Sequence, residues 1–509
     1  MGAPAAPERS LRIGPMSRAV GTSLTEPARD KPGSGRVRAL WNWLTRSSGP
    51  RGAQPISAGD LKLARAIFRD ILAEIGGEAS ARQRVATLAS LYRGLNDDGR
   101  TQLLGLLADE FGPDELEINR AIQAYLDAQG PGRRHAESQL RLALGSPRIR
   151  ILKQFNLLPD GVKLLVDMRA DVLRYVGRTR ELEPAGTRGQ RPLVDPPIQH
   201  EPLEVLDEEL YSLLGSWFDI GNLELRRITW NSPAMLLEKL IAYEAVHEIQ
   251  SWADLRNRLD SDRRCYAFFH PRMPDEPLVF VEIALVKDMA DNIHSLLDES
   301  APAFDPHAAQ AAIFYSISTS QAGLRGVSFG GFLIKRVVET LSADLPRLRT
   351  FATLSPVPGF RQWLEAQARS KDPGFFGAKE RARLCEEAGV RDPHEALAQL
   401  LLRGFATEAQ PPESLRPILT RLCAQYLVEA KHEDRPLDSV ARFHLGNGAR
   451  LDRINWLADT SPRGIKQSAG IMVNYLYKPD EIEDNHEAYA REGRVVISDA
   501  VKRLLRKPA

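Results

Sequence analysis

Residues 311–360 read AAIFYSISTSQAGLRGVSFGGFLIKRVVETLSADLPRLRTFATLSPVPGF, and this stretch decides the fold. An apolar run at its start predicts a buried strand, and a loop with glycines leads into the spacing of an amphipathic helix from Phe332 onward. A second strand spans Leu348–Leu354 and ends at Ser355, because the prolines that follow do not continue a strand. The order strand, loop, helix, strand predicts a mixed α and β domain.

The loop that leads into this helix is the candidate phosphate-binding site. Backbone N–H groups at a helix N-terminus have no partner within the helix and, together with the helix dipole, favour an anion. Glycine allows the backbone to approach a ligand closely. The glycine spacing matches neither a Walker loop nor a dinucleotide fingerprint, so a tight connection without a ligand is the alternative. The candidate binding residues are Arg325, Gly326, Val327, Ser328, Phe329, Gly330 and Gly331.

The same loop satisfies a second pattern, G-x-S-x-G, at residues 326–330. In α/β-hydrolases this pattern carries the nucleophile, which would be Ser328 here with His444 as its base. A hydrolase serine follows directly on a buried strand, whereas a polar stretch separates Ser328 from the strand in this chain. A serine hydrolase that uses Ser328 is therefore the less favoured alternative.

Two residues outside the loop are candidates for catalysis. Ser355 ends a strand, at the edge of the sheet where open α/β folds form crevices. His444 lies in a short predicted helix with Asp438 or Ser439 as its N-cap and Gly446 at its end. A histidine of near-neutral pKa gives or takes protons or holds a carboxylate. Taken singly, each residue is equally compatible with a purely structural role.

The composition limits the class of protein. A chain of 509 residues with 43% hydrophobic residues and a net charge of +1 has room for two or three domains. The balanced charge gives no reason to expect a nucleic acid or a membrane as partner. Three widely spaced cysteines and the absence of an HExxH motif argue against a disulfide framework and a metal site. No apolar run has the length of a membrane span, so we expect a soluble intracellular protein without a metal.

Three regions follow from the distribution of residue types. Residues 1–56 are rich in arginine and proline and poor in acids, which predicts a disordered tail or, alternatively, a transit peptide. Residues 57–220 show helical spacing without a chemical motif, include a proline- and glycine-rich linker at 183–202, and are predicted to be a helical domain for oligomer contacts. Residues 221–509 are predicted to form the catalytic domain.

Further strands are predicted in the third region from alternating apolar residues. Cys265–Phe269 and Leu278–Val286 read as a hairpin. Arg453–Ala458 and Gly470–Tyr477 read as two later strands, and a helix follows near Val495–Leu505. The region is therefore mixed α and β along its whole length.

Several long motifs in a fixed order resemble the malonyl-CoA decarboxylase family. The first block is IFYSIS, GL-x-GV, G-x-FLIKRVV and LSP-x-PGF within residues 311–360. The second block contains FHLGNGA at 443–449, RINWLAD at 453–459 and NYLY at 474–477. The likeness is dense in these two blocks, looser at 217–286 and only architectural in the helical region.

The resemblance implies an α+β protein with an all-helical N-terminal domain and a catalytic domain of the GCN5-type acetyltransferase fold (GNAT). It implies a homotetramer that needs no metal or organic cofactor and converts malonyl-CoA to acetyl-CoA and CO2. The family's catalytic serine and histidine correspond to Ser355 and His444, and Ser316 and Tyr477 match further substrate-binding positions. The CoA pyrophosphate is expected at Arg325–Gly331.

Two function classes besides decarboxylation are compatible with these residues. A GCN5-type acyl-CoA transferase uses the same CoA loop, but nothing in the sequence identifies a site for an amine acceptor. A serine thioesterase would use Ser328. We expect a cytoplasmic location, with the mitochondrial matrix as the alternative if the arginine-rich N-terminus is a transit peptide.

Overall fold

A computed structural model describes residues 54–182, 200–327, 330–372, 374–403 and 412–506. The chain divides into two compact units, Met1–Trp43 and Leu44–Ala509, and all the described residues belong to the second unit. The predicted tail at 1–56 and linker at 183–202 lie almost entirely outside the described residues. Both therefore stay predictions.

The first described region contains only helices and short 3₁₀ turns. Its first helix begins with a capping box: the Ser57 hydroxyl accepts a hydrogen bond from the backbone N–H of Asp60, whose carboxylate accepts one from the backbone N–H of Ser57. The helices are α2 (Ala58–Leu72), α3 (Glu78–Gly94), α4 (Asp97–Glu110), α5 (Glu115–Asp127), α6 (Pro131–Ala143), α7 (Pro147–Gln154), α8 (Gly161–Leu182) and α9 (His200–Trp217). The predicted helical character of this region is confirmed.

An eight-stranded mixed sheet forms the framework of the second described region. The strands are β1 (Glu224–Ile228), β2 (Arg263–Phe269), β3 (Val279–Val286), β4 (Ala311–Thr319), β5 (Thr350–Thr353), β6 (Ser355–Pro356), β9 (Arg450–Asn455) and β10 (Met472–Tyr477). They lie in the order β1-β2-β3-β4-β5-β10-β6, and β9 also pairs with β10. All the pairings are antiparallel except that of β4 with β5.

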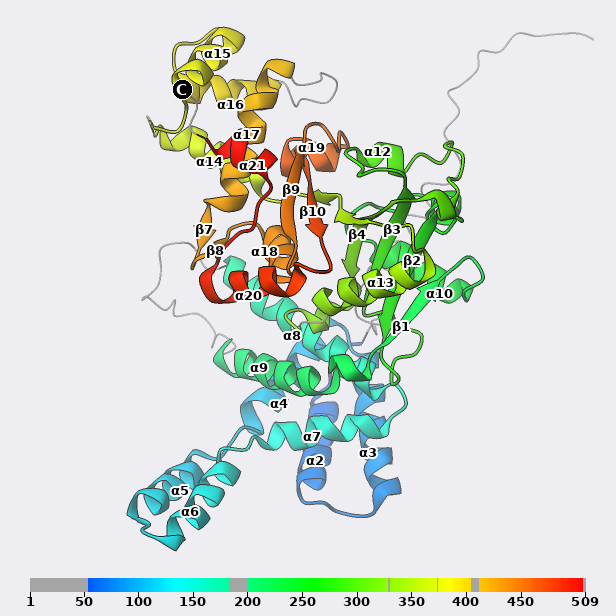
Figure 1. The fold of residues 1–509 in the computed structure, drawn as a ribbon. Helices are drawn as coiled ribbons and strands as arrows, with labels where there is room; N and C mark the ends of the chain where they lie inside the picture. The colour runs from blue at the N-terminus through cyan, green and yellow to red at the C-terminus, as the bar shows by residue number, and fades with distance from the viewer. Residues whose placement is uncertain (1–53, 183–199, 328–329, 373, 404–411, 507–509) are drawn as a thin grey trace, which may run out of the picture. The chain divides into compact units, whose positions relative to one another are not determined.

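Helices cover both faces of the sheet (Figure 1). Helix α13 (Gly330–Asp344) packs on one face, where Phe332 stacks on Phe268 of β2. Helices α10 (Ala234–Tyr243) and α11 (Trp252–Arg258) cover the other face, against Cys265, Ala267 and Phe269 of β2 and Phe280 of β3. The alternation of side chains along β2 thus supplies one apolar set to each layer.

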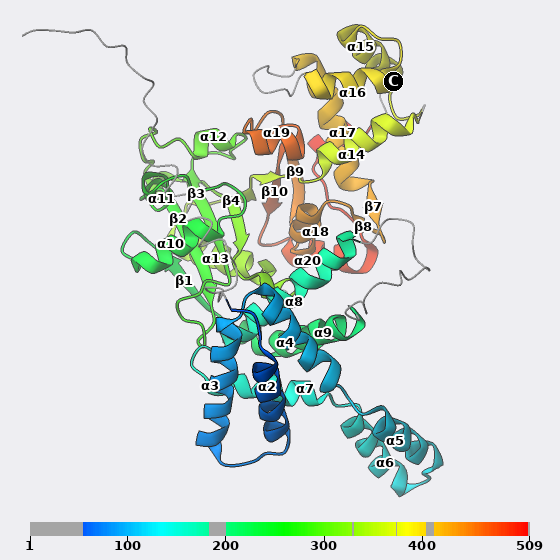
Figure 2. The same cartoon turned by 180° about the vertical axis from the view of Figure 1, so that it is seen from behind.

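The remaining helices lie beside the middle and the second half of the sheet, except that the pair at 378–403 projects away from it (Figure 2). They are α12 (Ile293–Leu296), α14 (Phe360–Ser370), α15 (Ala378–Ala388), α16 (Pro393–Arg403), α17 (Arg416–Val428), α18 (Ser439–Gly446), α19 (Pro462–Ser468), α20 (Ile482–Glu492) and α21 (Asp499–Leu505). A separate two-stranded ribbon joins β7 (Lys431–His432) to β8 (Arg435–Pro436). The predicted α+β class with a helical N-terminal region is confirmed.

Several predicted boundaries were wrong. Ser355 does not follow the end of a strand but begins β6, because the chain after β5 resumes its antiparallel pairing with β10 in the same register. Strand β9 begins three residues earlier than predicted, at Arg450, and ends at Asn455. Helix α20 and the polar edge strand β1 were missed. The described helices include none long and apolar enough to cross a membrane.

Candidate active site

A buried chain of hydrogen bonds joins three of the predicted site residues. His444 on α18 places its Nε2 3.1 Å from Oγ of Ser355 on β6, and its Nδ1 2.8 Å from the hydroxyl of Tyr477 on β10. Ser355 donates in turn to Oγ1 of Thr353, at 2.8 Å. All four residues are buried. The structure therefore brings Ser355, His444 and Tyr477 together, although they lie far apart in the sequence.

The partners of His444 define where its proton is. Burial lowers the pKa of His444 to about 3, so the imidazole is neutral at physiological pH and carries one N–H. Because the Ser355 hydrogen points to Thr353, Nε2 is the nitrogen that donates to Ser355 and Nδ1 accepts from the Tyr477 hydroxyl. Hydrogen bonds thus run in one direction, from Tyr477 through His444 to Ser355.

Helix α18 holds the imidazole in a fixed orientation. Asp438 is its N-cap and accepts from the backbone N–H of Ala441 at 2.8 Å, as predicted for one of two candidate caps. The His444 ring stacks on Tyr475 with centroids 4.6 Å apart. Past the helix end, Gly448 has φ +77°, and a Cβ there would lie 2.1 Å from the carbonyl oxygen of Ile482. The second glycine of FHLGNGA, Gly448, is therefore required for the chain to pass the start of α20.

A second set of polar groups holds Thr353, the acceptor of the Ser355 hydrogen bond. The Asn474 side chain donates to the carbonyl oxygen of Thr353 at 2.7 Å, and the Tyr475 backbone N–H donates to Thr353 Oγ1 at 3.1 Å. Arg453 and Asn455 on β9 both donate to the Asn474 side-chain oxygen, at 3.0 and 2.8 Å. This network explains the arginine and asparagines of the second sequence block. Thr353 itself was missed, because no pattern distinguishes it from other strand threonines.

Strands β4 and β5 part beside this chain, and we call this place the β4–β5 divergence. Their last pair is Phe314 with Thr353, and the N–H of Leu354 still donates to the Phe314 carbonyl. Beyond it, β4 continues along β3, whereas Ser355 pairs with Val473 of β10. Ser316 and Ser355 each stand two residues past the last pair. The two strands therefore carry the two predicted serines to either side of the divergence.

Ser316 is not part of the Tyr477–His444–Ser355 chain. Its hydroxyl lies 2.7 and 2.8 Å from the two carboxylate oxygens of Glu244, which follows α10. Within the described ranges, no hydrogen bond joins Ser316 to Ser355, His444 or Tyr477. The predicted site therefore has two parts, and sequence reasoning missed Glu244.

The predicted phosphate loop is held by the helical region. Arg169 of α8 donates from Nη1 to the carbonyl oxygens of Gly323 and Arg325, at 2.7 and 2.9 Å, and pairs with Asp207 of α9 at 2.8 Å. A Cβ on Gly323 would lie 1.8 Å from the Val166 carbonyl oxygen, so the loop packs directly on the α8 backbone. Helices of the first region thus fix the backbone of the loop.

The outcome for the loop residues is mixed. Arg325 and Gly326 are exposed, and Gly326 has φ +87°, as expected for a glycine that turns the chain. Val327 is half-buried. Gly330 and Gly331 begin α13, which confirms the predicted helix N-terminus. Ser328 and Phe329 lie outside the described residues, so neither the ligand contact nor the hydrolase alternative at Ser328 is tested.

A cavity of about 210 Å³ reaches Tyr477 from the surface. Its walls come from α13, α20 and the segment after α18, and Lys335 pairs with Glu483 across them. The lining residues are Ile220, Phe332, Lys335, Asn447, Tyr477, Ile482, Glu483 and His486. The cavity lies between the N-terminal turns of α13 and Tyr477, so Tyr477 is the member of the buried chain that lines it. Over the part of the sequence that the structure describes, no group of three or more His, Cys, Asp or Glu side chains is arranged to hold a metal ion.

Comparison with known proteins identifies related sequences over most of the chain. The model of the malonyl-CoA decarboxylase C-terminal domain matches residues 221–509, and that of the malonyl-CoA decarboxylase N-terminal domain matches residues 111–218. The mitochondrial malonyl-CoA decarboxylase of Rattus norvegicus is 37% identical and covers 90% of this chain and 94% of its own length. That of Anser anser anser is 38% identical over 83% of each chain.

Solved structures give the same result. The crystal structure of malonyl-CoA decarboxylase from Rhodopseudomonas palustris is 42% identical, with a TM-score of 0.75 over 88% of this chain and 100% of that one. The enzyme from Agrobacterium vitis is 40% identical, with a TM-score of 0.74 over 88% of this chain and 99% of that one. The similarity therefore extends over both described regions.

Proposed function

This chain belongs to the malonyl-CoA decarboxylase family, and we propose that it converts malonyl-CoA to acetyl-CoA and CO2 through a thioester enolate. The observation that carries the proposal is the buried chain Tyr477–His444–Ser355 beside the β4–β5 divergence. The reaction needs a dry site, a fixed malonyl group and one proton. This arrangement supplies the dry site and the proton.

Loss of CO2 breaks the bond between C2 and the carboxylate carbon and leaves the electron pair on the thioester. The pair delocalises into the carbonyl as an enolate only if the breaking bond lies perpendicular to the thioester plane. Each hydrogen-bond donor aimed at the thioester oxygen stabilises that enolate by about 3 kcal/mol. In the proposal, Ser355 approaches the malonyl group from one strand of the divergence, Ser316 lies on the other strand, and Tyr477 acts through its hydrogen bond to His444.

The neutral imidazole then serves as a relay for one proton. The Ser355 hydroxyl gives its proton to C2 of the enolate, and the Nε2 proton of His444 moves to Ser355 Oγ. The Tyr477 hydroxyl proton moves to Nδ1, and water in the cavity returns a proton to Tyr477. Histidine thereby changes tautomer without becoming charged, which suits a ring whose pKa burial lowers to about 3.

The loop Arg325–Gly331 is proposed to bind the CoA pyrophosphate. Support comes from its place at the N-terminus of α13 and from the exposure of Arg325. Arg169 of the helical region fixes the loop backbone, and the proposal gives it no contact with the ligand. No step of the proposed chemistry uses a metal or an organic cofactor.

Incubation of the purified protein with malonyl-CoA alone tests this function. We expect acetyl-CoA and an equal amount of CO2, identified by mass spectrometry and CO2 trapping. Free CoA with malonate would instead favour the thioesterase that uses Ser328. If malonyl-CoA stays unchanged alone but is consumed once an amine is added, the GCN5-type transferase would be favoured.

We further propose a homotetramer in which the helical domain, residues 57–220, supplies contacts between subunits. Helix α5 has no buried residue and α6 has only Ala136, yet the pair carries exposed leucines. Leu116, Leu126 and Leu142 are 67, 66 and 69% exposed. Sedimentation of the wild type against Leu126→Glu measures whether this pair of helices contributes: a lighter species is expected for the variant.

The location in the cell stays a prediction. A cytoplasmic enzyme is expected, with the mitochondrial matrix as the alternative, and the rat and goose relatives are both named as mitochondrial malonyl-CoA decarboxylases. The arginine-rich residues 1–56 support the alternative. Import of a fluorescent protein fused to residues 1–56 into isolated mitochondria distinguishes the two.

A further inference from the structure

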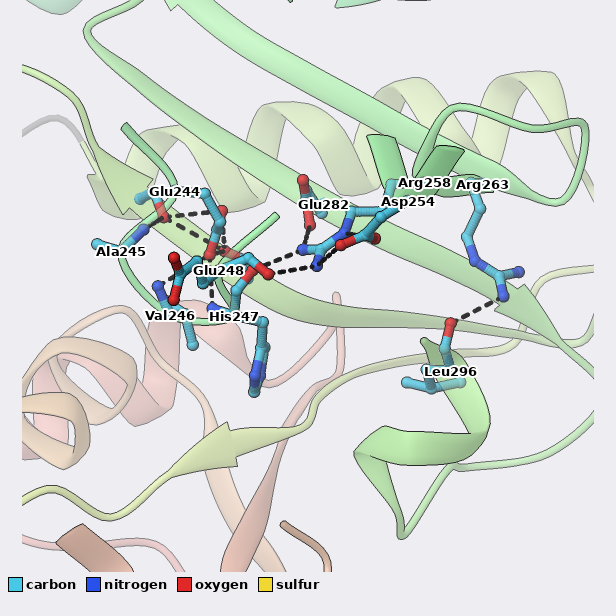
Figure 3. A network of polar contacts seen from close by, with 12 residues as sticks. Glu244, Ala245, Val246, His247, Glu248, Asp254, Arg258, Arg263, Glu282 and Leu296 are labelled. Carbon is cyan, nitrogen blue, oxygen red and sulfur yellow. Dashed lines mark hydrogen bonds and ion pairs between the residues drawn. The ribbon is translucent and has the colours of Figure 1, made fainter. Parts of the chain in front are cut away.

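A buried polar cluster lies on the α10 face of β3 and β4 (Figure 3). We call it the Glu244 cluster: Glu244, Ser316, Ser318 and the backbone N–H groups of Ala245, Val246 and His247. Beside it, Arg258 binds Glu282 of β3 and Asp254 of α11. The proposed mechanism so far uses Ser316 but none of the groups that hold it.

The hydrogen bonds of Glu244 fix the hydroxyl groups around it. Its Oε1 accepts from the N–H groups of Val246 and His247, both at 2.8 Å. Its two oxygens also accept from the Ser316 hydroxyl at 2.7 and 2.8 Å, and Oε2 accepts from Ser318 at 3.1 Å. The Ser318 oxygen itself accepts from the Ala245 N–H at 3.1 Å. Four donors around one carboxyl group form the pattern of an ionised carboxylate.

These hydrogen bonds fix the direction in which the Ser316 hydroxyl hydrogen points. A serine hydroxyl has one hydrogen and two lone pairs, and the hydrogen of Ser316 is committed to the Glu244 carboxylate. Toward any third group Ser316 therefore offers only lone pairs. If Ser316 donated a hydrogen bond to a substrate carboxylate or thioester oxygen, its 2.7 Å hydrogen bond to Glu244 would have to break.

We propose that Glu244 is a positioning residue that holds Ser316 as a hydrogen-bond acceptor at the β4–β5 divergence, and that the donor is an amide N–H of the pantetheine arm of the substrate. This inference rests on the proposed function. The malonyl carboxylate and the thioester carry no hydrogen-bond donor at neutral pH. Moving from the thioester along the arm, the first donor is the N–H of the cysteamine amide.

The position of Ser316 fits this role. Ser316 stands two residues beyond the last pair of β4 with β5, as Ser355 does on the other strand. In the proposal, a thioester held at Ser355 extends its sulfur side across the divergence toward β4. Ser316 is 2% exposed, so an unpaired amide N–H beside it would lose its hydrogen bond to water without replacement.

The neighbouring ion pairs provide a matched control. Arg258 binds Asp254 at 2.7 Å and Glu282 at 3.0 Å, and all three side chains are buried. None of the three donates to or accepts from Ser316 in the described structure. Asp254→Asn therefore disturbs the adjacent buried network, in which Arg258 also donates to the carbonyls of His247 and Glu248, but removes no hydrogen bond of Ser316 or Glu244.

Two small thioesters test the inference. Malonyl-S-N-acetylcysteamine has the amide N–H, and its ester counterpart, malonyl-S-(2-acetoxyethyl), has oxygen in that position. The wild type should prefer the amide by about tenfold in kcat/KM, which is the value of one neutral hydrogen bond. The preference should disappear in Ser316→Ala and in Glu244→Gln, whose amide donates to Ser316 and turns its hydrogen outward.

The preference should persist in Ser316→Thr, which keeps the acceptor, and in Asp254→Asn. Equal kcat/KM for the two thioesters in the wild type would overturn the inference, as would an unchanged preference in Ser316→Ala. Because Ser316→Ala and Ser316→Thr suffice for this decision, it does not depend on the folding of Glu244→Gln. Turnover of malonyl-CoA distinguishes failure of the proposed function from failure of the inference. No acetyl-CoA from the wild type would refute both. Acetyl-CoA formation without an amide preference would refute the inference alone.

Discussion

The two buried polar groups at the β4–β5 divergence differ in charge. The Tyr477–His444–Ser355 chain contains only neutral groups, each passing one hydrogen to the next. The Glu244 cluster is organised around a carboxylate that collects four donors. A neutral chain can shift its protons without separating charge, whereas a buried carboxylate fixes the hydrogens of its neighbours. We infer that the first group performs chemistry and the second provides orientation.

The largest expected effect concerns the first member of the neutral chain. Tyr477→Phe removes the hydroxyl that donates to His444 Nδ1 and should lower kcat by roughly 100-fold with little change in KM. Tyr475→Phe is the matched control, because its ring stacks on His444 but its hydroxyl has no hydrogen-bond partner in the described structure. Steady-state kinetics on both variants measure the difference. Equal losses would mean that packing, and not the relay, is what Tyr477 contributes.

A loss of stability is expected instead at the Glu244 cluster. Glu244→Ala leaves two backbone N–H groups and two hydroxyls buried without their acceptor, which should lower the free energy of unfolding by about 4 kcal/mol. Tyr477→Phe should cost about 1 kcal/mol, because it removes one neutral hydrogen bond. Urea unfolding compares the two variants. A smaller loss for Glu244→Ala than for Tyr477→Phe would contradict the assignment of a fixed charge to Glu244.

The neutral imidazole also makes stability depend on pH. The pKa of His444 falls from 6.5 to about 3 on burial, so the unfolded chain binds the proton more readily. The contribution of His444 to stability is therefore fully present above pH 6.5 and decreases as the pH falls toward 3, by about 4 kcal/mol. His444→Gln should lack this part of the decrease. Unfolding curves of wild type and variant that stay parallel over this range would show that His444 is not held neutral.

The smallest expected effect lies in the helical region. Arg169→Lys loses the planar group that reaches the carbonyls of Gly323 and Arg325, and should raise KM for malonyl-CoA by about fivefold at unchanged kcat. Arg148→Lys is the control, because Arg148 is likewise buried but bonds to Ala108 and Glu209, away from the loop. A similar KM for malonyl-CoA in both variants would show that the contacts of Arg169 with the loop do not contribute to substrate binding.

The sequence predicted most of the framework of the site but not its second half. The β2–β3 hairpin and the order β4, α13, β5 follow from long apolar runs whose period changes from two to that of a helix. Strand β1 was missed because ELRRI is a polar edge strand with one buried residue. Motif resemblance indicated Ser355 and His444, which lie 89 residues apart, although single residues of either type are usually structural.

Glu244 could not be predicted in the same way. It is one glutamate after an amphipathic helix, and nothing local distinguishes it from an exposed acid. Its role depends on contact with Ser316, 72 residues later, through packing of α10 on the sheet. Thr353 is similar, because its role as an acceptor for Ser355 appears only where the chain leaves β4 after β5 and continues along β10 as β6. Contacts of this kind require the three-dimensional structure.

The most direct test of the account is the rate of acetyl-CoA formation by Ser355→Ala and His444→Gln, measured together with the affinity of each variant for CoA. The account predicts that kcat falls by about 100-fold or more in both variants while the affinity for CoA stays within about twofold, because the loop and not the chain holds the nucleotide. A His444→Gln enzyme with near wild-type kcat would contradict the proposed relay.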